Sequence, residues 1–131
     1  MSAAVRKFAA EMLTELKRAS DDEVLALKRD IAEYALVGVT NRMPVLTGQA
    51  RANTVVSKVT PHKEWEKSTD PLGTVTIAKG QAVIDSDIDP YKPIYINNNV
   101  PYFEKLEAGF SGKAPLGMFA ITVAEIEAIY G

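Results

Sequence analysis

The segment from Tyr95 to Met118 holds a dense series of residues that dictate backbone geometry. Its order reads as an apolar strand, an Asn-rich turn, a proline-started helical turn, a glycine exit and a Pro-Gly loop. Pro101 suits the first position of a short helix, and Gly109 suits its left-handed exit. No residue pattern in the segment has evident catalytic chemistry. We therefore expect the segment to hold a defined shape, and a chemically quiet shape of this kind suggests a contact surface.

The chain has 131 residues, a length that fits one domain with a hydrophobic core of its own. Its formal net charge of −2 is too small to indicate nucleic acid or a membrane surface as a partner. The absence of cysteine excludes disulfides and thiolate metal sites and fits a reducing cytoplasm. No segment has the layout of a signal peptide or the length of an apolar membrane span, so we expect a soluble product.

Two amphipathic helices are predicted at the N-terminal end. The first covers Ala3–Arg18, and Ser20 with Glu23 has the spacing of a capping box that starts a second helix. The second helix is expected over Asp21–Arg42, because Pro44 prevents its continuation. Apolar residues recur at helical spacing on one face of the first helix, namely Val5, Phe8, Ala9, Met12, Leu13 and Leu16.

The apolar stripe of the second helix broadens at Leu36, Val37 and Val39, which indicates burial on more than one side. Such burial would come either from the core of the domain or from a neighbouring subunit. Both alternatives remain open at this point, with the domain core favoured.

The remainder of the chain mixes strands with short helices. Strands are predicted within Asn53–Val59 and Pro93–Asn97, and a last helix within Met118–Tyr130. Pro61–Gly73 is expected to form an exposed loop, whereas Thr74–Ile84 fits either a strand or a helix interrupted by Gly80. This order predicts a single α+β domain over residues 1–131, with a helical pair in 1–42 and an α+β part in 43–131.

The groups needed for catalysis are sparse. His62 is the single histidine and lies in the charged loop, without a nucleophile in a suitable context. Glu104 and Glu107 can share a face of the short helix, but nothing indicates the burial that acid–base work by paired carboxylates requires. We therefore assign no catalytic and no cofactor-binding residue.

The sequence supports a metal site or a nucleic-acid site no better than it supports a catalytic site. Asp85, Asp87 and Asp89 alternate as in a calcium loop, yet Pro90 and Ile96 stand where an EF-hand needs glycine and glutamate. An acidic surface turn is the simpler interpretation, and no metal ligand is assigned. The cations of the N-terminal helices are interleaved with acidic residues, a pattern typical of a solvated helical surface rather than of phosphate binding.

Three stretches together carry a family resemblance: TGQARANTVVS at 47–57, YINNNVPYFEKLEAGFSGKAPLGM at 95–118 and ITVAEIEAIY at 121–130. In this order and spacing the chain resembles the neck and minor tail proteins of tailed bacteriophages, which include the minor tail protein Z type of phage lambda. The resemblance covers roughly residues 30 to 130. One departure is Thr54, which follows the Arg-Ala-Asn triplet where relatives commonly carry tryptophan. The resemblance also suggests a helix at about Thr76–Asp85.

The resemblance implies a structural role in the virion and no enzymatic activity or cofactor. It implies tail completion and head–tail joining by a homo-oligomeric ring, expected as a hexamer, that lies between the head connector and the tail tube. The implied partners are other neck, connector and tail-tube proteins, without a membrane, and DNA would be contacted only through the ring lumen. The protein would be made in the host cytoplasm and end in the tail or neck of the virion.

We hypothesise that the opening segment supplies contacts between subunits or between rings. The residues expected at that interface are Tyr102, Phe103, Leu106, Phe110 and Pro115, with Phe103 and Phe110 as those expected to face a partner. The residues expected to set its geometry are Gly48, Pro101, Gly109 and Gly117. The competing interpretation is that Tyr102, Leu106 and Met118 close the domain's own core.

Three other functions stay open on sequence grounds. A tail-terminator ring that caps the tail tube needs the same kind of ring-forming α+β subunit. A sheath- or baseplate-associated accessory protein would lie away from the portal. A small phage enzyme or DNA-binding protein would instead show turnover or salt-sensitive affinity for DNA.

Overall fold

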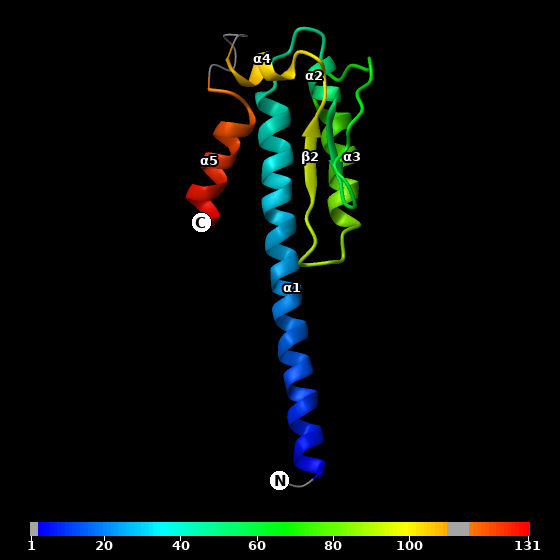
Figure 1. Cartoon of the computed structure of the whole chain (residues 1–131), viewed down its shortest axis with the longest axis vertical. Helices are drawn as coiled ribbons and strands as arrows, with labels where there is room; N and C mark the ends of the chain where they lie inside the picture. Colours follow the sequence, from blue (N-terminus) through cyan, green and yellow to red (C-terminus); the bar gives the residue numbers. More distant parts are fainter. Residues whose placement is uncertain (1–2, 110–115) are drawn as a thin grey trace.

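The fold is α+β, as predicted from the sequence, with a small antiparallel sheet, short helices and a C-terminal helix (Figure 1). A computed structural model describes residues 3–109 and 116–131. The elements in chain order are α1 (Ala3–Arg42), α2 (Gln49–Ala52), β1 (Thr54–Ser57), α3 (Thr74–Asp85), β2 (Tyr95–Asn98), α4 (Phe103–Glu107) and α5 (Phe119–Tyr130).

The two predicted N-terminal helices are one continuous helix of 40 residues, α1, and the predicted restart at Ser20 is wrong. No glycine or proline lies near Ser20, so a capping-box sequence alone does not interrupt a segment that is helix-forming on both sides. Asp21 instead accepts a tertiary hydrogen bond of 2.6 Å from the Tyr91 hydroxyl. At 1.5 Å per residue, α1 is about 60 Å long.

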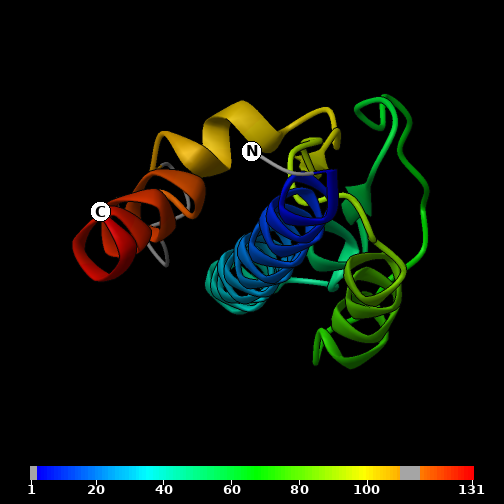
Figure 2. The same cartoon turned by 90° about the horizontal axis from the view of Figure 1, so that it is seen from below.

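α1 is the axis around which the other elements are arranged. It lies between α5 on one side and α3 with the sheet on the other (Figures 1 and 2). β1 and β2 pair antiparallel with Thr54 opposite Asn98 and Ser57 opposite Tyr95. The predicted strands and the predicted C-terminal helix are therefore present, each within one or two residues of its expected bounds.

The core consists of two clusters on the C-terminal half of α1. One gathers where α1 meets α3 and the sheet, and its members are Ala32, Leu36, Val56 and Ile84. The other lies towards α4 and α5, and its members are Val39, Met43, Ala50, Val100 and Met118. The broad apolar end of α1 is thus buried within the chain itself, which supports the domain-core alternative.

The ambiguous segment Thr74–Ile84 is helical, as the family resemblance suggested. Gly80, which obscured the helical pattern, marks the point where α3 comes closest to α1. A β-carbon at Gly80 would lie 2.5 Å from a methyl carbon of Leu36 and 2.9 Å from one of Val56. Close packing therefore accounts for a residue that disfavours a helix in isolation.

Candidate functional site

The end of α1 is fixed by Arg51, which comes from the first of the sequence stretches that carry the resemblance. Its guanidinium donates hydrogen bonds to the carbonyl oxygens of Asn41 at 2.9 Å, Met43 at 3.2 Å and Pro71 at 2.9 Å. Carbonyls at the last turn of a helix lack intrahelical partners, and a cation also suits the helix dipole there. Arg51 therefore ties the C-terminal end of α1 to α2 and to the 58–73 loop.

Asn53 and Asn98 complete this connection. The Asn53 amide donates to the Gln49 and Glu66 carbonyls, each at 2.8 Å, and its oxygen accepts from the Glu66 N–H at 2.7 Å. Asn98 donates to the Ala50 carbonyl at 2.7 Å. Both asparagines are buried, and their side-chain amides are satisfied by backbone groups of neighbouring segments.

Thr54, the departure from the family pattern, is also buried and accepts a hydrogen bond of 3.2 Å from the Asn98 side chain. The threonine hydroxyl thus joins the same polar network that links β1 to β2.

α5 begins at a carboxylate from α4. Glu107 accepts hydrogen bonds from the backbone N–H groups of Met118 at 3.0 Å, Phe119 at 2.9 Å and Ala120 at 3.1 Å. A negative charge at a helix N-terminus satisfies unpaired donors and interacts favourably with the helix dipole. Glu107, half of the carboxylate pair in the sequence analysis, therefore acts as a structural cap.

The glycines expected to set geometry have positive φ angles of 86° at Gly48, 90° at Gly109 and 82° at Gly117. Gly48 also lies so close to the next loop that a β-carbon there would be 2.4 Å from the Pro71 nitrogen. Pro101 is exposed and lies in the turn that precedes α4. These residues fix the path of the chain on both sides of α4.

An apolar groove lies between α4 and the segment that follows α1. We call it the α4 groove; it has a volume of about 530 Å³, and its lining residues are Pro44, Val45, Leu46, Thr47, Gly48, Gln49, Ala50, Tyr102 and Leu106. Leu46 is 95% exposed at its rim. The Tyr102 hydroxyl donates a 2.9 Å hydrogen bond to Gln49, and partial burial raises the pKa of this phenol.

The predicted interface residues divide between the core and the exposed groove differently from our expectation. Phe103 packs edge-on against Phe119, with ring centroids 5.5 Å apart, and contacts the core cluster around Met118. Tyr102 is instead the more open side chain, at 37% exposed, while Leu106 contacts both the core and the α4 groove. Met118 is fully buried, in agreement with the core interpretation for that residue.

Phe110 and Pro115, the other two predicted interface residues, lie outside the described residues. Of the predicted set, the structure therefore brings Tyr102 and Leu106 together in the α4 groove. The segment from Pro44 to Thr47, which completes the groove, was missed by sequence reasoning. Leu46, an apolar residue beside a Thr-Gly turn, was the signal that could have indicated it.

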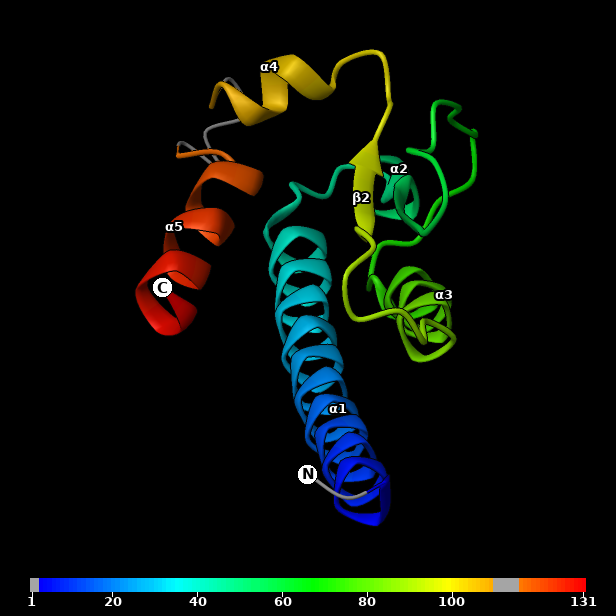
Figure 3. The ribbon, with the colours of Figure 1, turned by 60° about the horizontal axis from the view of Figure 1, so that its bottom comes forward.

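A second apolar surface lies at the opposite end of the molecule. We call residues 3–20 of α1 the arm; it extends away from the other described elements (Figures 1 and 3). Large apolar side chains are exposed along it, at 61% for Phe8, 49% for Met12 and 67% for Leu13. The helical spacing of these residues places them on one side of the arm.

α5 is attached to α1 largely through polar groups. Arg42 pairs with Glu125 and donates a 2.8 Å hydrogen bond to the Thr122 hydroxyl. Tyr34 donates to Glu125 and meets Tyr130 edge-on, with ring centroids 6.5 Å apart. The hydrogen bond to Glu125 raises the pKa of Tyr34, and burial adds to that increase.

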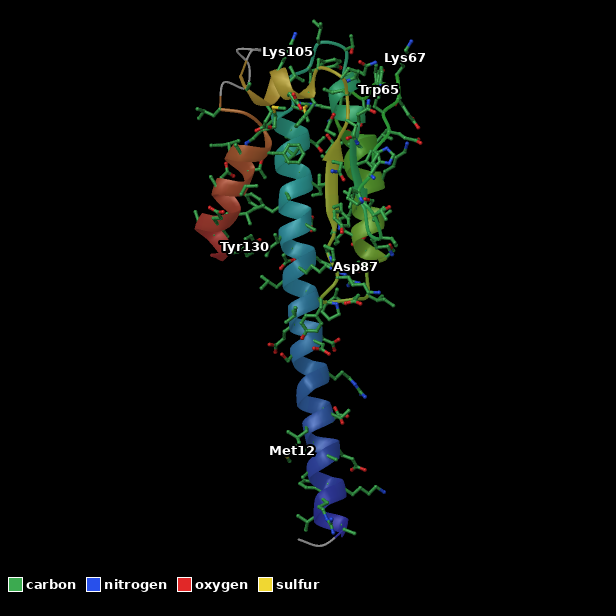
Figure 4. All side chains as sticks on the ribbon, viewed as in Figure 1. Met12, Trp65, Lys67, Asp87, Lys105 and Tyr130 are labelled. Carbon is green, nitrogen blue, oxygen red and sulfur yellow. The ribbon has the colours of Figure 1, made fainter. Side chains whose placement is uncertain are left out.

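The aspartates that resembled a calcium loop have separate structural partners. Asp87, which is labelled in Figure 4, is buried and forms a 2.5 Å ion pair with Lys28 on α1. Asp89 accepts hydrogen bonds from the N–H groups of Tyr91 at 2.9 Å and Lys92 at 3.1 Å. Within residues 3–109 and 116–131, no group of three or more His, Cys, Asp or Glu side chains is placed to hold a metal ion.

The buried Asp87 and the half-buried Asp70 both have lowered pKa values. Burial opposes ionisation of Asp87, but the hydrogen bond and charge of Lys28 outweigh it and leave its pKa below 3.8. Burial likewise acts against ionisation of Asp70, while hydrogen bonds from the N–H and hydroxyl of Thr76 lower its pKa overall. Asp70 thereby caps the N-terminal turn of α3.

Comparisons of the chain with protein-family models, curated proteins and solved structures find no match. Among the described helices, none is both long enough and apolar enough to span a bilayer.

Proposed function

We propose that this chain is a structural virion protein of a tailed phage or prophage. In this role it is a tail-completion component of the neck that forms a homo-oligomeric ring between the head connector and the tail tube. The observation that carries the proposal, together with the sequence resemblance, is the presence of two separate exposed apolar surfaces. The α4 groove and the arm lie at opposite ends of the described chain (Figures 1 and 4).

A ring subunit needs two different patches, because cyclic symmetry brings one face of each subunit against another face of its neighbour. A ring stacked between two others also needs surfaces for the partners above and below. Exposed apolar surface beyond isolated side chains is typical of such contact sites. The surfaces of this chain therefore suit assembly better than they suit a monomer in solution.

The α4 groove has the rigidity that a docking surface benefits from. Its lining includes Ala50 of α2 and Leu106 of α4. These two helices are held against neighbouring elements by hydrogen bonds of Arg51, Asn98 and Glu107. A surface that is already ordered loses little conformational entropy when a partner binds. We infer that this groove receives an apolar side chain or short segment from an adjacent neck component.

The role can be tested by deleting the gene from the phage or prophage that carries it and examining the particles by electron microscopy. A tail-completion component predicts DNA-filled heads and unjoined tails of normal length. Tails of abnormal length would instead indicate a tail terminator. Normal joined particles would contradict both ring functions.

The groove itself can be tested by complementation with Leu46→Glu, a change at a side chain that is 95% exposed and thus tolerated by the fold. The matched control is Val59→Glu, which introduces the same charge at a side chain that is 88% exposed outside the groove. We expect joining to fail with the first variant and to proceed with the second. Equal joining with both would remove the groove from the proposal.

A further inference from the structure

We propose that the arm is the self-association element of this protein and packs side by side against the arm of a second copy of the chain. This proposal rests on the assembling role proposed above, since it names the partner of one of the two surfaces. It goes beyond that role in assigning the contact to residues 3–20 of α1, and it commits to a copy of the same chain as the occupant.

The accessible surface area of the chain is larger than that of a compact monomer of the same mass. The chain has an accessible surface of 8523 Å². A compact monomer of 14.3 kDa is expected to expose about 6,800 Å². The excess is about 1,700 Å², and an ordinary specific interface buries about 800 Å² on each partner. The surplus is about twice what one subunit loses in an ordinary contact, so the chain exposes enough surface for a contact of that size.

The arm contributes apolar surface in a form that a helix can cover. Phe8, Met12 and Leu13 are all about half exposed or more, and no other described helix or strand lies beside them (Figures 1 and 3). Phe8 and Met12 lie one turn apart on the same side of the helix and Leu13 lies about 100° from Met12, so the three form a broad apolar face. An exposed apolar face of this kind is typical of a contact surface.

This apolar face also continues a contact that the chain makes internally. Met12 and Tyr34 are separated by about 40° around an ideal helix, and Tyr34 is a residue through which α1 holds α5. Figure 4 shows Met12 on the same side of α1 as α5, beyond the C-terminal end of that helix. α5 thus covers one part of this side of α1, and the uncovered part offers room for another helix laid along it.

Among the described elements, the element that matches the arm in length and in the size of its exposed apolar side chains is the arm itself. α4 has 5 residues and the α4 groove is correspondingly short. α5 also exposes Val123 at 49% and Ile129 at 58%, but it has only 12 residues and is shorter than the arm. Pairing of two arms would bury Phe8 and Met12 of both copies against side chains of the same kind.

The test uses the full chain in sedimentation velocity from low micromolar concentration to about 1 mM, a range that detects even millimolar association. The arm variant carries Phe8→Glu with Met12→Glu. The control carries Thr14→Glu with Arg18→Gln, which makes the same change of −2 in charge on the polar side of the arm. We expect the wild type and the control to associate, and the arm variant to associate at least 100-fold more weakly.

Hydrogen exchange locates the contact independently of the variants. Amides of residues 3–20 should gain protection as the wild-type concentration rises, and those of the arm variant should not. Circular dichroism checks that the arm variant keeps its fold. Wild-type protein that stays monomeric at 1 mM would overturn the proposal, as would a variant that associates like the control. A gene deletion that leaves head–tail joining intact would overturn the proposed function but not this result.

Discussion

Gly117 packs directly against the Glu107 side chain: a β-carbon on residue 117 would lie 2.3 Å from a carboxylate oxygen of Glu107. The same carboxylate accepts hydrogen bonds from the first N–H groups of α5. With its positive φ of 82°, Gly117 brings the start of α5 directly against the end of α4. The close contact at Gly117 and the cap from Glu107 therefore act together to position α5 beside α1.

Glu107→Ala should destabilise the fold by about 1–2 kcal/mol, because three backbone donors at the start of α5 lose a charged acceptor. Glu107→Gln should fall between the wild type and the alanine variant, since an amide oxygen still accepts but carries no charge. Urea unfolding measures the effect. Glu104→Ala is the matched control at an exposed position on the same helix. Equal losses from both alanine variants would contradict the capping role.

Arg51→Ala should cost about 1–2 kcal/mol, because the carbonyls of Asn41, Met43 and Pro71 lose their donors together. Arg51→Lys should recover less than half of that loss, since an ammonium group cannot span three separate carbonyls as a guanidinium does. The measurement is the free energy of unfolding in urea, with Arg18→Ala on the exposed arm as control. Full recovery by lysine would show that charge alone, rather than the fork geometry, matters at this position.

Local patterns predicted the elements of this fold well, because strands, loop and C-terminal helix each follow from short-range periodicity and turn residues. The pattern failed at Ser20, where a good capping sequence lies inside a continuous helix. It was indecisive at Gly80, where the reason for glycine is a contact with Leu36 on another element. Such contacts depend on the tertiary arrangement and leave no periodic signal in the local sequence.

The candidate site was predicted in part. Tyr102 and Leu106 line one groove, but Phe103 turns towards Phe119 and the core, because helix α4 presents adjacent residues on different sides. Leu46 lines the groove because the segment that follows α1 lies close to α4. The arm was recognised as amphipathic, yet its projection beyond the rest of the chain depends on where the other elements pack.

Asn53→Ala should loosen the 58–73 loop, because the Glu66 N–H and carbonyl both lose their partner in the buried asparagine. We expect trypsin to cut at Lys63 and Lys67 several-fold faster than in the wild type, since local opening governs proteolysis of a folded chain. Asn41→Ala, at an exposed position, serves as the control. An unchanged cleavage rate would mean that other contacts hold the loop.

Acid should destabilise the protein through Asp70 and Asp87. Both carboxyls have folded-state pKa values below their usual 3.8, so the unfolded chain binds protons first as the pH falls. Their contribution is fully present above the unfolded value and is lost as the pH drops through the lower folded values. Urea midpoints between pH 6 and pH 2.5 should therefore decline mainly below pH 4.

Asp70→Asn should flatten that decline, because a side chain that cannot titrate contributes no pH dependence. Asp22→Asn, at an exposed position on α1, is the matched control. A wild-type midpoint that stays constant down to pH 2.5 would contradict the assigned direction of both pKa shifts.

We propose that this chain forms a ring in the neck of a tailed phage. An electron cryo-microscopy reconstruction of the virion that carries the gene tests it most directly. We predict a closed ring of copies between the head connector and the tail tube, with the 40-residue α1 recognisable in each subunit. Absence of the chain from the particle, or its location away from the junction of head and tail, would contradict the account.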